Sequence, residues 1–190
     1  MRSSIILILL LRSFVSFSQY DYSPTAKNPF GKLNPDAPKE VADYKDLIGI
    51  CDCKSVKRID RDNWADTVDM KWTYKYILNG LAVQDETLKS DGTHGGSIRQ
   101  YNVDSSMWYV HFYTSSVSAP ALPAWGGGMK DGEIVLYRDQ LAPNGMEGFF
   151  RITFSDISKQ GFNWNGAWTS KDESIIYPTW RIFCSKTEDE

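Results

Sequence analysis

Residues 70–83 read MKWTYKYILNGLAV, and this stretch decides the fold. Apolar and polar side chains alternate from Met70 to Leu78, which is the pattern of a β-strand with one buried face. Asn79-Gly80 follows and favours a two-residue type I′ turn, because both central residues of that turn need a positive φ. A second extended run starts at Leu81. The stretch therefore predicts a β-hairpin.

Further extended runs follow at short intervals along the rest of the chain. The expected strands are 48–56, 70–78, a run from 81, 95–102, 107–115, 133–138, 147–154, 161–170 and 175–185. About nine strands separated by turn signals are typical of an antiparallel barrel or a sandwich. Nearly every connection is short enough for a hairpin, whereas sandwiches usually need Greek-key crossings. The sequence therefore predicts an all-β, antiparallel up-and-down barrel.

Four segments make up the expected domain organisation. Residues 1–18 are a signal peptide, 19–36 a mobile N-terminal arm rich in turn formers, 37–186 the barrel domain and 187–190 an acidic tail. A short helix is expected over about 37–46, because Asn34 or Asp36 can cap it and Val41, Tyr44 and Leu47 or Ile48 form an apolar face. This helix would close one end of the barrel. Residues 116–128 are expected to be an irregular connection whose Gly126-Gly-Gly128 run acts as a lid or hinge.

The first eighteen residues indicate export. Arg2 is followed by an apolar run from Ile5 to Leu11, and Val15-Ser-Phe-Ser18 offers small residues before a cleavage site at Gln19. The run is too short to span a membrane, and no later stretch is long enough, so no integral membrane segment is expected. The residue immediately after the cleavage site is Gln19 and not a cysteine, which argues against a lipid anchor. We therefore expect a secreted or periplasmic protein.

Charge and ligand-forming residues exclude several function classes. The net charge of −3 becomes −5 once Arg2 and Arg12 are removed, and no basic cluster is visible, so nucleic acid is not an expected partner. The chain has two histidines and no metal-ligand spacing, so neither a metal nor a cofactor is expected. Export permits disulfides. Cys51 or Cys53, near the start of the barrel, is expected to pair with Cys184 near its end, because the first and last strands of a closed barrel are neighbours.

Alternation along each strand predicts which side chains face the interior. A two-residue turn pairs Tyr76 with Val83 and Tyr74 with Asp85. The four-residue connection 103–106 pairs Trp108 with Tyr101 and Val110 with Arg99. The side chains expected to face inward on these and the later strands are Trp72, Tyr74, Tyr76, Leu78, Val83, Asp85, Arg99, Tyr101, Trp108, Val110, Phe112, Phe150, Ile152, Phe154, Phe162, Trp164 and Trp168. Gln84, Glu86, Tyr109, His111 and Tyr113 are expected to face outward. A slip of one residue in either turn would reverse these faces.

The expected interior is aromatic with a few polar groups, which indicates a ligand cavity. A buried charge is costly unless it is paired, so Asp85 and Arg99 either satisfy each other and nearby tyrosines or meet a polar ligand group. The expected partner is a small apolar or aromatic molecule. The candidate lining residues are Trp72, Tyr74, Tyr76, Asp85, Arg99, Tyr101, Trp108 and Trp164. No catalytic residue is assigned.

Several motifs resemble those of a bacterial family. They are the Leu78-Asn79-Gly80 hairpin, the strand Gly96-Ser-Ile-Arg-Gln-Tyr-Asn102 with Trp108 six residues later, and a short helix ending in Leu47-Ile-Gly49. Over residues 39–185 the chain resembles the lipocalin-like proteins of domain-of-unknown-function family fifteen-seventy-nine. The resemblance implies a closed barrel of the lipocalin (calycin) type. It implies no established activity and no catalytic residue.

Four alternatives to ligand binding remain open. In a structural barrel, the aromatic side chains would simply fill the interior. An enzyme would use Asp85 and Arg99 with Tyr74 or Tyr101 as acid, base and anion clamp. Haem or a metal would bind through His94 or His111. Exposed aromatic residues, among them Tyr109, Tyr113 and Trp125, would recognise a glycan or a protein surface.

Overall fold

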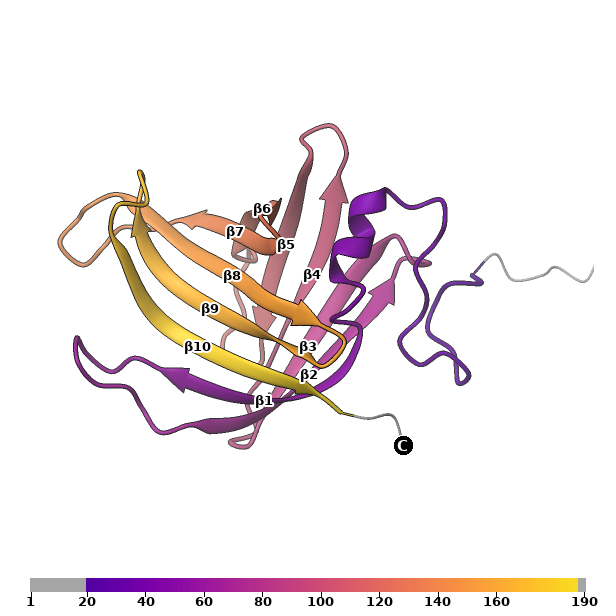
Figure 1. The fold of residues 1–190 in the computed structure, drawn as a ribbon, viewed down its shortest axis with the longest axis horizontal. Coiled ribbons are helices and arrows are strands. Elements are labelled where there is room, and N and C mark those ends of the chain that lie inside the picture. Colours follow the sequence, from indigo (N-terminus) through magenta and orange to yellow (C-terminus); the bar gives the residue numbers. More distant parts are fainter. Residues whose placement is uncertain (1–19, 188–190) are drawn as a thin grey trace, which may run out of the picture.

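A computed structural model describes residues 20–187 as a closed barrel of ten antiparallel strands (Figure 1). The strands are β1 (Gly49–Lys57), β2 (Val68–Ile77), β3 (Ala82–Lys89), β4 (His94–Asn102), β5 (Met107–Thr114), β6 (Ala124–Lys130), β7 (Glu133–Asp139), β8 (Gly148–Ser158), β9 (Gly161–Ser170) and β10 (Ile176–Lys186). Each strand pairs with its neighbour in sequence, and β1 pairs with β10. The prediction of an up-and-down barrel is confirmed. The predicted signal peptide and residues 188–190 of the acidic tail lie outside the described residues.

Strand β6 corrects the prediction of an irregular lid at residues 116–128. Ala124–Lys130 pairs with both β5 and β7, so the Gly126-Gly-Gly128 run is part of the barrel wall. A Cβ on Gly127 would lie 2.1 Å from the carbonyl oxygen of Val135 on β7, so the close approach of the two strands needs glycine. Glycines carry no side chain that can alternate, which is why periodicity missed this strand.

The hairpin between β2 and β3 has the predicted register. Tyr74 lies opposite Asp85 and Tyr76 opposite Val83. The turn is longer than predicted, because Leu78, Asn79 and Gly80 all have positive φ and the ladder ends at the pair Ile77–Ala82. Leu78 is therefore 57% exposed, and its assignment to the interior is wrong.

The hairpin between β4 and β5 also has the predicted register. Arg99 lies opposite Val110 and Tyr101 opposite Trp108. Arg99 and Val110 are each 3% exposed, so both face the interior. Two charged side chains of opposite sign, Asp85 and Arg99, are thereby brought into the barrel from adjacent strands.

The N-terminal segment forms a short 3₁₀ helix, η1 (Lys39–Tyr44), in place of the expected helix over 37–46. Neither expected cap forms, since Asn34 instead accepts a hydrogen bond from the Asp36 N–H and donates one to the Asn79 carbonyl. The preceding residues pack on the β2–β3 hairpin, where the Phe30 carbonyl accepts the Tyr76 N–H. Residues 20–36 are therefore attached to one end of the barrel rather than forming a free arm.

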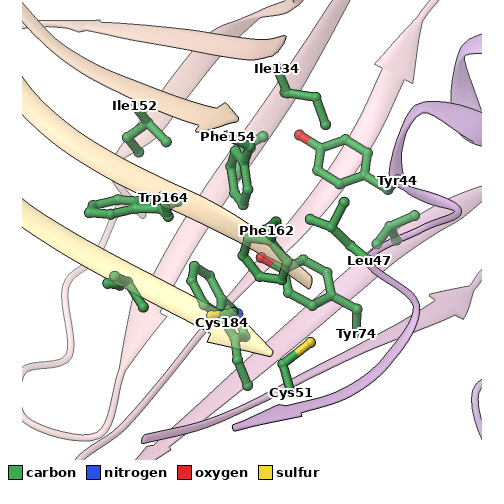
Figure 2. Packing of buried hydrophobic residues seen from close by; sticks show 14 of the residues in the cluster. Tyr44, Leu47, Cys51, Tyr74, Ile134, Ile152, Phe154, Phe162, Trp164 and Cys184 are labelled. Atoms are coloured by element: carbon green, nitrogen blue, oxygen red, sulfur yellow. The ribbon is translucent and has the colours of Figure 1, made fainter. Parts of the chain in front are cut away.

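Helix η1 and the turn after it fill that end of the barrel. Val41, Tyr44 and Leu47 are fully buried. The Tyr44 ring meets Trp108 edge-on at 4.8 Å. It also meets Phe154 edge-on at 6.1 Å (Figure 2). The β1–β2 and β9–β10 loops lie at the opposite end, away from the helix (Figure 1). No helix in residues 20–187 has the length and apolar character that crossing a membrane requires.

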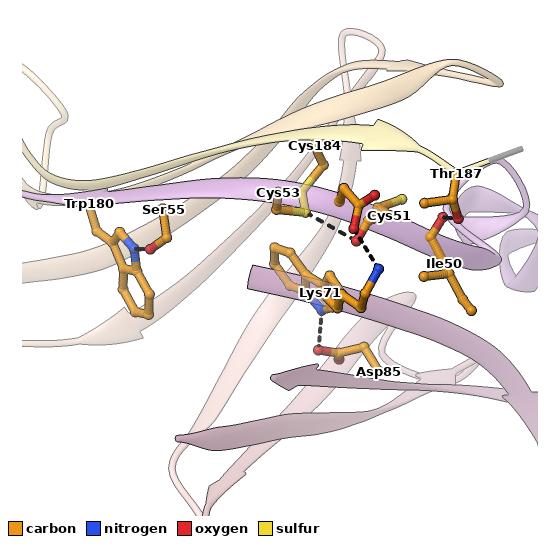
Figure 3. The surroundings of a disulfide bond; sticks show 11 residues. Ile50, Cys51, Cys53, Ser55, Lys71, Asp85, Trp180, Cys184 and Thr187 are labelled. Atoms are coloured by element: carbon orange, nitrogen blue, oxygen red, sulfur yellow. Dashed lines mark hydrogen bonds and ion pairs between the residues drawn. A yellow bond between two sulfur atoms is a disulfide. The ribbon is translucent and has the colours of Figure 1, made fainter. Parts of the chain in front are cut away.

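A disulfide bond links the first and last strands (Figure 3). Cys53 lies directly opposite Cys184 in the register of β1 and β10, and the two form the bond across 131 residues of chain. Cys51 faces the same side of β1, but it is opposite Lys186 and remains a buried free thiol. The bond thus closes the barrel covalently where its two ends of chain meet.

We expect the Cys53→Ala/Cys184→Ala variant to lose about 2–5 kcal/mol of unfolding free energy, because the crosslink restricts a long loop of the unfolded chain. Urea unfolding of the oxidised protein measures this. The matched control is Cys51→Ala, which removes a cysteine from the same strand without removing a crosslink. Equal losses in the two variants would contradict the prediction, as would an intact mass showing that the wild type retains the two hydrogens of free thiols.

Candidate functional site

The end of the barrel opposite η1 contains a cavity of about 330 Å³. Its walls are mainly aromatic and aliphatic, and all ten strands contribute residues to its lining. They include Phe112, Trp125, Phe150, Trp164, Trp180 and Ile182. Its mouth lies at the strand ends farthest from the helix and is bordered by Lys57, Lys89, Thr93, His94, Thr114 and Ser116.

The floor of the cavity is a buried ion pair. Arg99 donates to Asp85, and each side chain is 3% exposed. The second carboxylate oxygen of Asp85 accepts a hydrogen bond from the Trp72 indole N–H at 2.7 Å. The guanidinium carbon of Arg99 lies 5.2 Å from the ring centres of both Tyr44 and Tyr74. Pairing and cation–π contacts together compensate two charges that would otherwise be costly in an apolar interior.

Two buried donors beside the cavity have no hydrogen-bond partner in residues 20–187. They are the Nε of Arg99 and the indole N–H of Trp125. Both residues line the cavity. A buried donor left unsatisfied costs about 1–3 kcal/mol, so an acceptor atom placed in the cavity would be stabilised there. The deep part of the cavity can therefore recognise a polar atom on an otherwise apolar molecule.

The tyrosines near the floor are poorly suited to acid–base chemistry. Burial raises the pKa of Tyr44 to about 12, although the nearby positive charge of Arg99 opposes the shift. Burial also raises the pKa of Tyr74 well above its ordinary value. Both phenols stay protonated and neutral at physiological pH. Neither lines the cavity.

The structure separates the eight candidate lining residues into two groups. Trp72, Asp85, Arg99 and Trp164 line the cavity. Tyr74, Tyr76, Tyr101 and Trp108 lie at the helix end of the interior and belong to the packing around η1. The Trp108 indole, for example, donates to Asp43 of η1 at 3.0 Å. Helix η1 decides this division, because it fills the end of the barrel that it covers.

The residues at the cavity mouth that were not identified from the sequence include Lys57, Lys89 and Trp180. Alternation along the strands predicts the inward orientation of the two lysines. Lys89 lies on the same face of β3 as Asp85, and Lys57 lies on the same face of β1 as Cys53. Both lysines line the mouth, as does Trp180. Charged residues at strand ends are easily assigned to loops, so the common inward orientation of Lys57 and Lys89 was not recognised.

The residues named for the haem and surface-recognition alternatives do not form one site. His94 lies at the cavity mouth, while His111 lies on the outward-facing positions of β5. Within residues 20–187, no three His, Cys, Asp or Glu side chains are grouped as they would be around a metal ion. Trp125, expected to be exposed, is 7% exposed and lines the cavity. Strand β6 turns it inward.

Neither the family models nor the curated proteins with which the chain was compared contain a match to it. Membership of the family named in the sequence analysis therefore stays a prediction. The candidate site is supported by its geometry.

We expect Arg99→Leu to cost about 3–5 kcal/mol of unfolding free energy, because it leaves the Asp85 carboxylate buried without its cation. Asp85→Asn/Arg99→Leu should recover part of that loss, since the amide carries no charge and still accepts the Trp72 N–H. Chemical denaturation of the two variants and the wild type tests this. A double variant no more stable than Arg99→Leu would contradict the role given to the ion pair.

We expect Tyr74→Phe to change stability at neutral pH by no more than about 1 kcal/mol, because the removed hydroxyl is buried and has no hydrogen-bond partner among residues 20–187. Above pH ~10 an unfolded tyrosine ionises while folded Tyr74 stays protonated, so the wild type loses stability by up to about 1.4 kcal/mol per pH unit for this group. The variant should lose less between pH 10 and 12. Urea unfolding across ~pH 8–12 measures both slopes, and equal slopes would contradict the assignment.

Proposed function

We propose that the protein binds a small, partly apolar molecule inside the barrel. The cavity carries this proposal. Its volume of about 330 Å³ falls at the lower end of the roughly 300–1,000 Å³ typical of small-molecule sites. Its apolar walls supply contact area, and the free donors of Arg99 and Trp125 supply specific recognition.

The two ends of the barrel support binding over a purely structural role. At the helix end, the interior is filled by Tyr44, Leu47 and the aromatic side chains around them. At the other end, side chains of similar size surround a cavity that opens at the mouth. A filled structural barrel would be expected to pack both ends alike.

An enzymatic role has less support from the same site. Asp85 and Arg99 neutralise each other and are both held in place, so neither is free to act as a base or an anion clamp. The tyrosines proposed as their partners lie outside the cavity. Binding without chemistry requires none of these groups to react.

The proposal places this binding outside the cytoplasm. The disulfide between Cys53 and Cys184 supports it, because such bonds persist mainly in oxidising compartments. The sequence features of residues 1–18 point in the same direction. The closed barrel also agrees with the fold that the lipocalin-like resemblance implies, and we propose that the chain is a distant member of that group.

Native mass spectrometry of protein purified gently from an exporting host tests the proposal. We expect an added mass that disappears on denaturation. Val110→Phe, which adds a ring to the cavity wall, should reduce that occupancy about tenfold or more without unfolding the barrel. The control is Ile98→Phe, which adds the same ring to an outward-facing position of β4.

A filled barrel gives a different set of results. The wild type would carry no added mass, and small aromatic probes would not bind by calorimetry. Val110→Phe would then behave like Ile98→Phe. This combination would overturn the proposed function.

A further inference from the structure

We propose that the ligand is an amphipathic anion whose negative group lies at the cavity mouth between Lys57 and Lys89 and whose flat apolar body extends inward past Trp180. This inference rests on the proposed binding function and specifies the class and orientation of the ligand. It is carried by the convergence of two ammonium groups on one ring at the cavity entrance.

Lys57 and Lys89 approach the same indole from different strands. The Nζ of Lys57 lies 4.4 Å from the ring centre of Trp180, and the Nζ of Lys89 lies 5.0 Å from it. Lys57 is directly opposite Trp180 in the pairing of β1 with β10. The two charges are thus placed together at the mouth by strands that are not neighbours.

The Trp180 ring is held in position by its own contacts. Its indole N–H donates to the Ser55 hydroxyl at 2.8 Å (Figure 3), and its ring meets Trp164 edge-on at 5.1 Å. Trp180 and Trp164 therefore form a continuous aromatic wall from the mouth into the cavity. A flat apolar group can pack along this wall while a charged group attached to it stays at the entrance.

Neither ammonium group forms a salt bridge among residues 20–187. By contrast, Lys54 pairs with Asp69 and Lys71 with Asp52 on the outer faces of the same sheet region. Asp91, on the turn after β3, is exposed and accepts the Thr93 N–H, and its charge acts on both lysines from beyond salt-bridge distance. The pKa of Lys89 is lowered by burial and then by the charge of Lys57, and the charge of Asp91 offsets only part of this shift. An anion between the two lysines would relieve both effects.

The charge distribution along the cavity fixes the orientation of the ligand. At the floor, Asp85 cancels the charge of Arg99. The remaining positive charge among the lining residues lies at the mouth, on Lys57 and Lys89. The anionic group is therefore attracted to the mouth. The free donors of Trp125 and Arg99 favour an uncharged acceptor atom at the inner end.

Three probes with one aromatic body test the inference by isothermal titration calorimetry. They are 1-naphthylacetate, 1-naphthylacetamide and 1-naphthylmethylamine, which end in an anion, a neutral amide and a cation. We expect the carboxylate to bind about fivefold to tenfold more tightly than the amide, because contacts between partly exposed charges contribute only modestly to affinity. We expect the amine to bind most weakly. The preference for the carboxylate should shrink as salt is added.

Variants of the lysines assign the preference to the mouth. Lys57→Gln/Lys89→Gln should bring the carboxylate and amide affinities to within about twofold of each other, with the amide affinity unchanged. Lys57→Arg/Lys89→Arg should restore the preference. The control is Lys75→Gln, which removes one positive charge from an outward-facing position of β2 and should leave the preference intact.

Contradictory outcomes separate this inference from the proposed function. If the wild type binds the carboxylate and the amide equally, or if the preference survives in the double glutamine variant, the anion site is overturned while cavity binding stands. If none of the three probes binds and the purified protein carries no added mass, the proposed function and this inference both fall.

Discussion

The buried ion pair between Asp85 and Arg99 is the constraint on which the interior depends. Two charges in an apolar barrel are tolerated because they pair with each other, because Trp72 donates to the carboxylate and because aromatic rings surround the guanidinium. The pair spans adjacent strands in the middle of the barrel. It divides the interior into a filled end beneath η1 and an open cavity.

Helix η1 and the disulfide complete this arrangement from opposite ends of the domain. The helix supplies Tyr44 and its neighbours, which fill one end of a barrel too wide for its own side chains to close. The bond between Cys53 and Cys184 holds together the first and last strands, whose pairing closes the wall. A barrel plugged at one end admits a molecule from the other, so access and packing are set by the same elements.

The electrostatics of the cavity follow from this division. The floor is neutral because its charges are paired, whereas the mouth carries two lysines that share one indole ring. A molecule that enters meets positive charge first, aromatic surface next and unsatisfied donors last. Under the proposed function, such a gradient would select for the order of groups along a ligand as well as for its size.

The sequence by itself determined the barrel class, the register of two hairpins and the inward orientation of Asp85 and Arg99, because alternation and turn residues act over a few neighbouring positions. Tertiary structure decided what depends on distant segments. The glycines of strand β6 are explained by the close approach of β7. The register of β1 with β10 places Cys53, and not Cys51, opposite Cys184. Helix η1 decided which aromatic residues fill the barrel and which line a cavity. These outcomes follow from barrel closure, a non-local constraint that no local pattern contains.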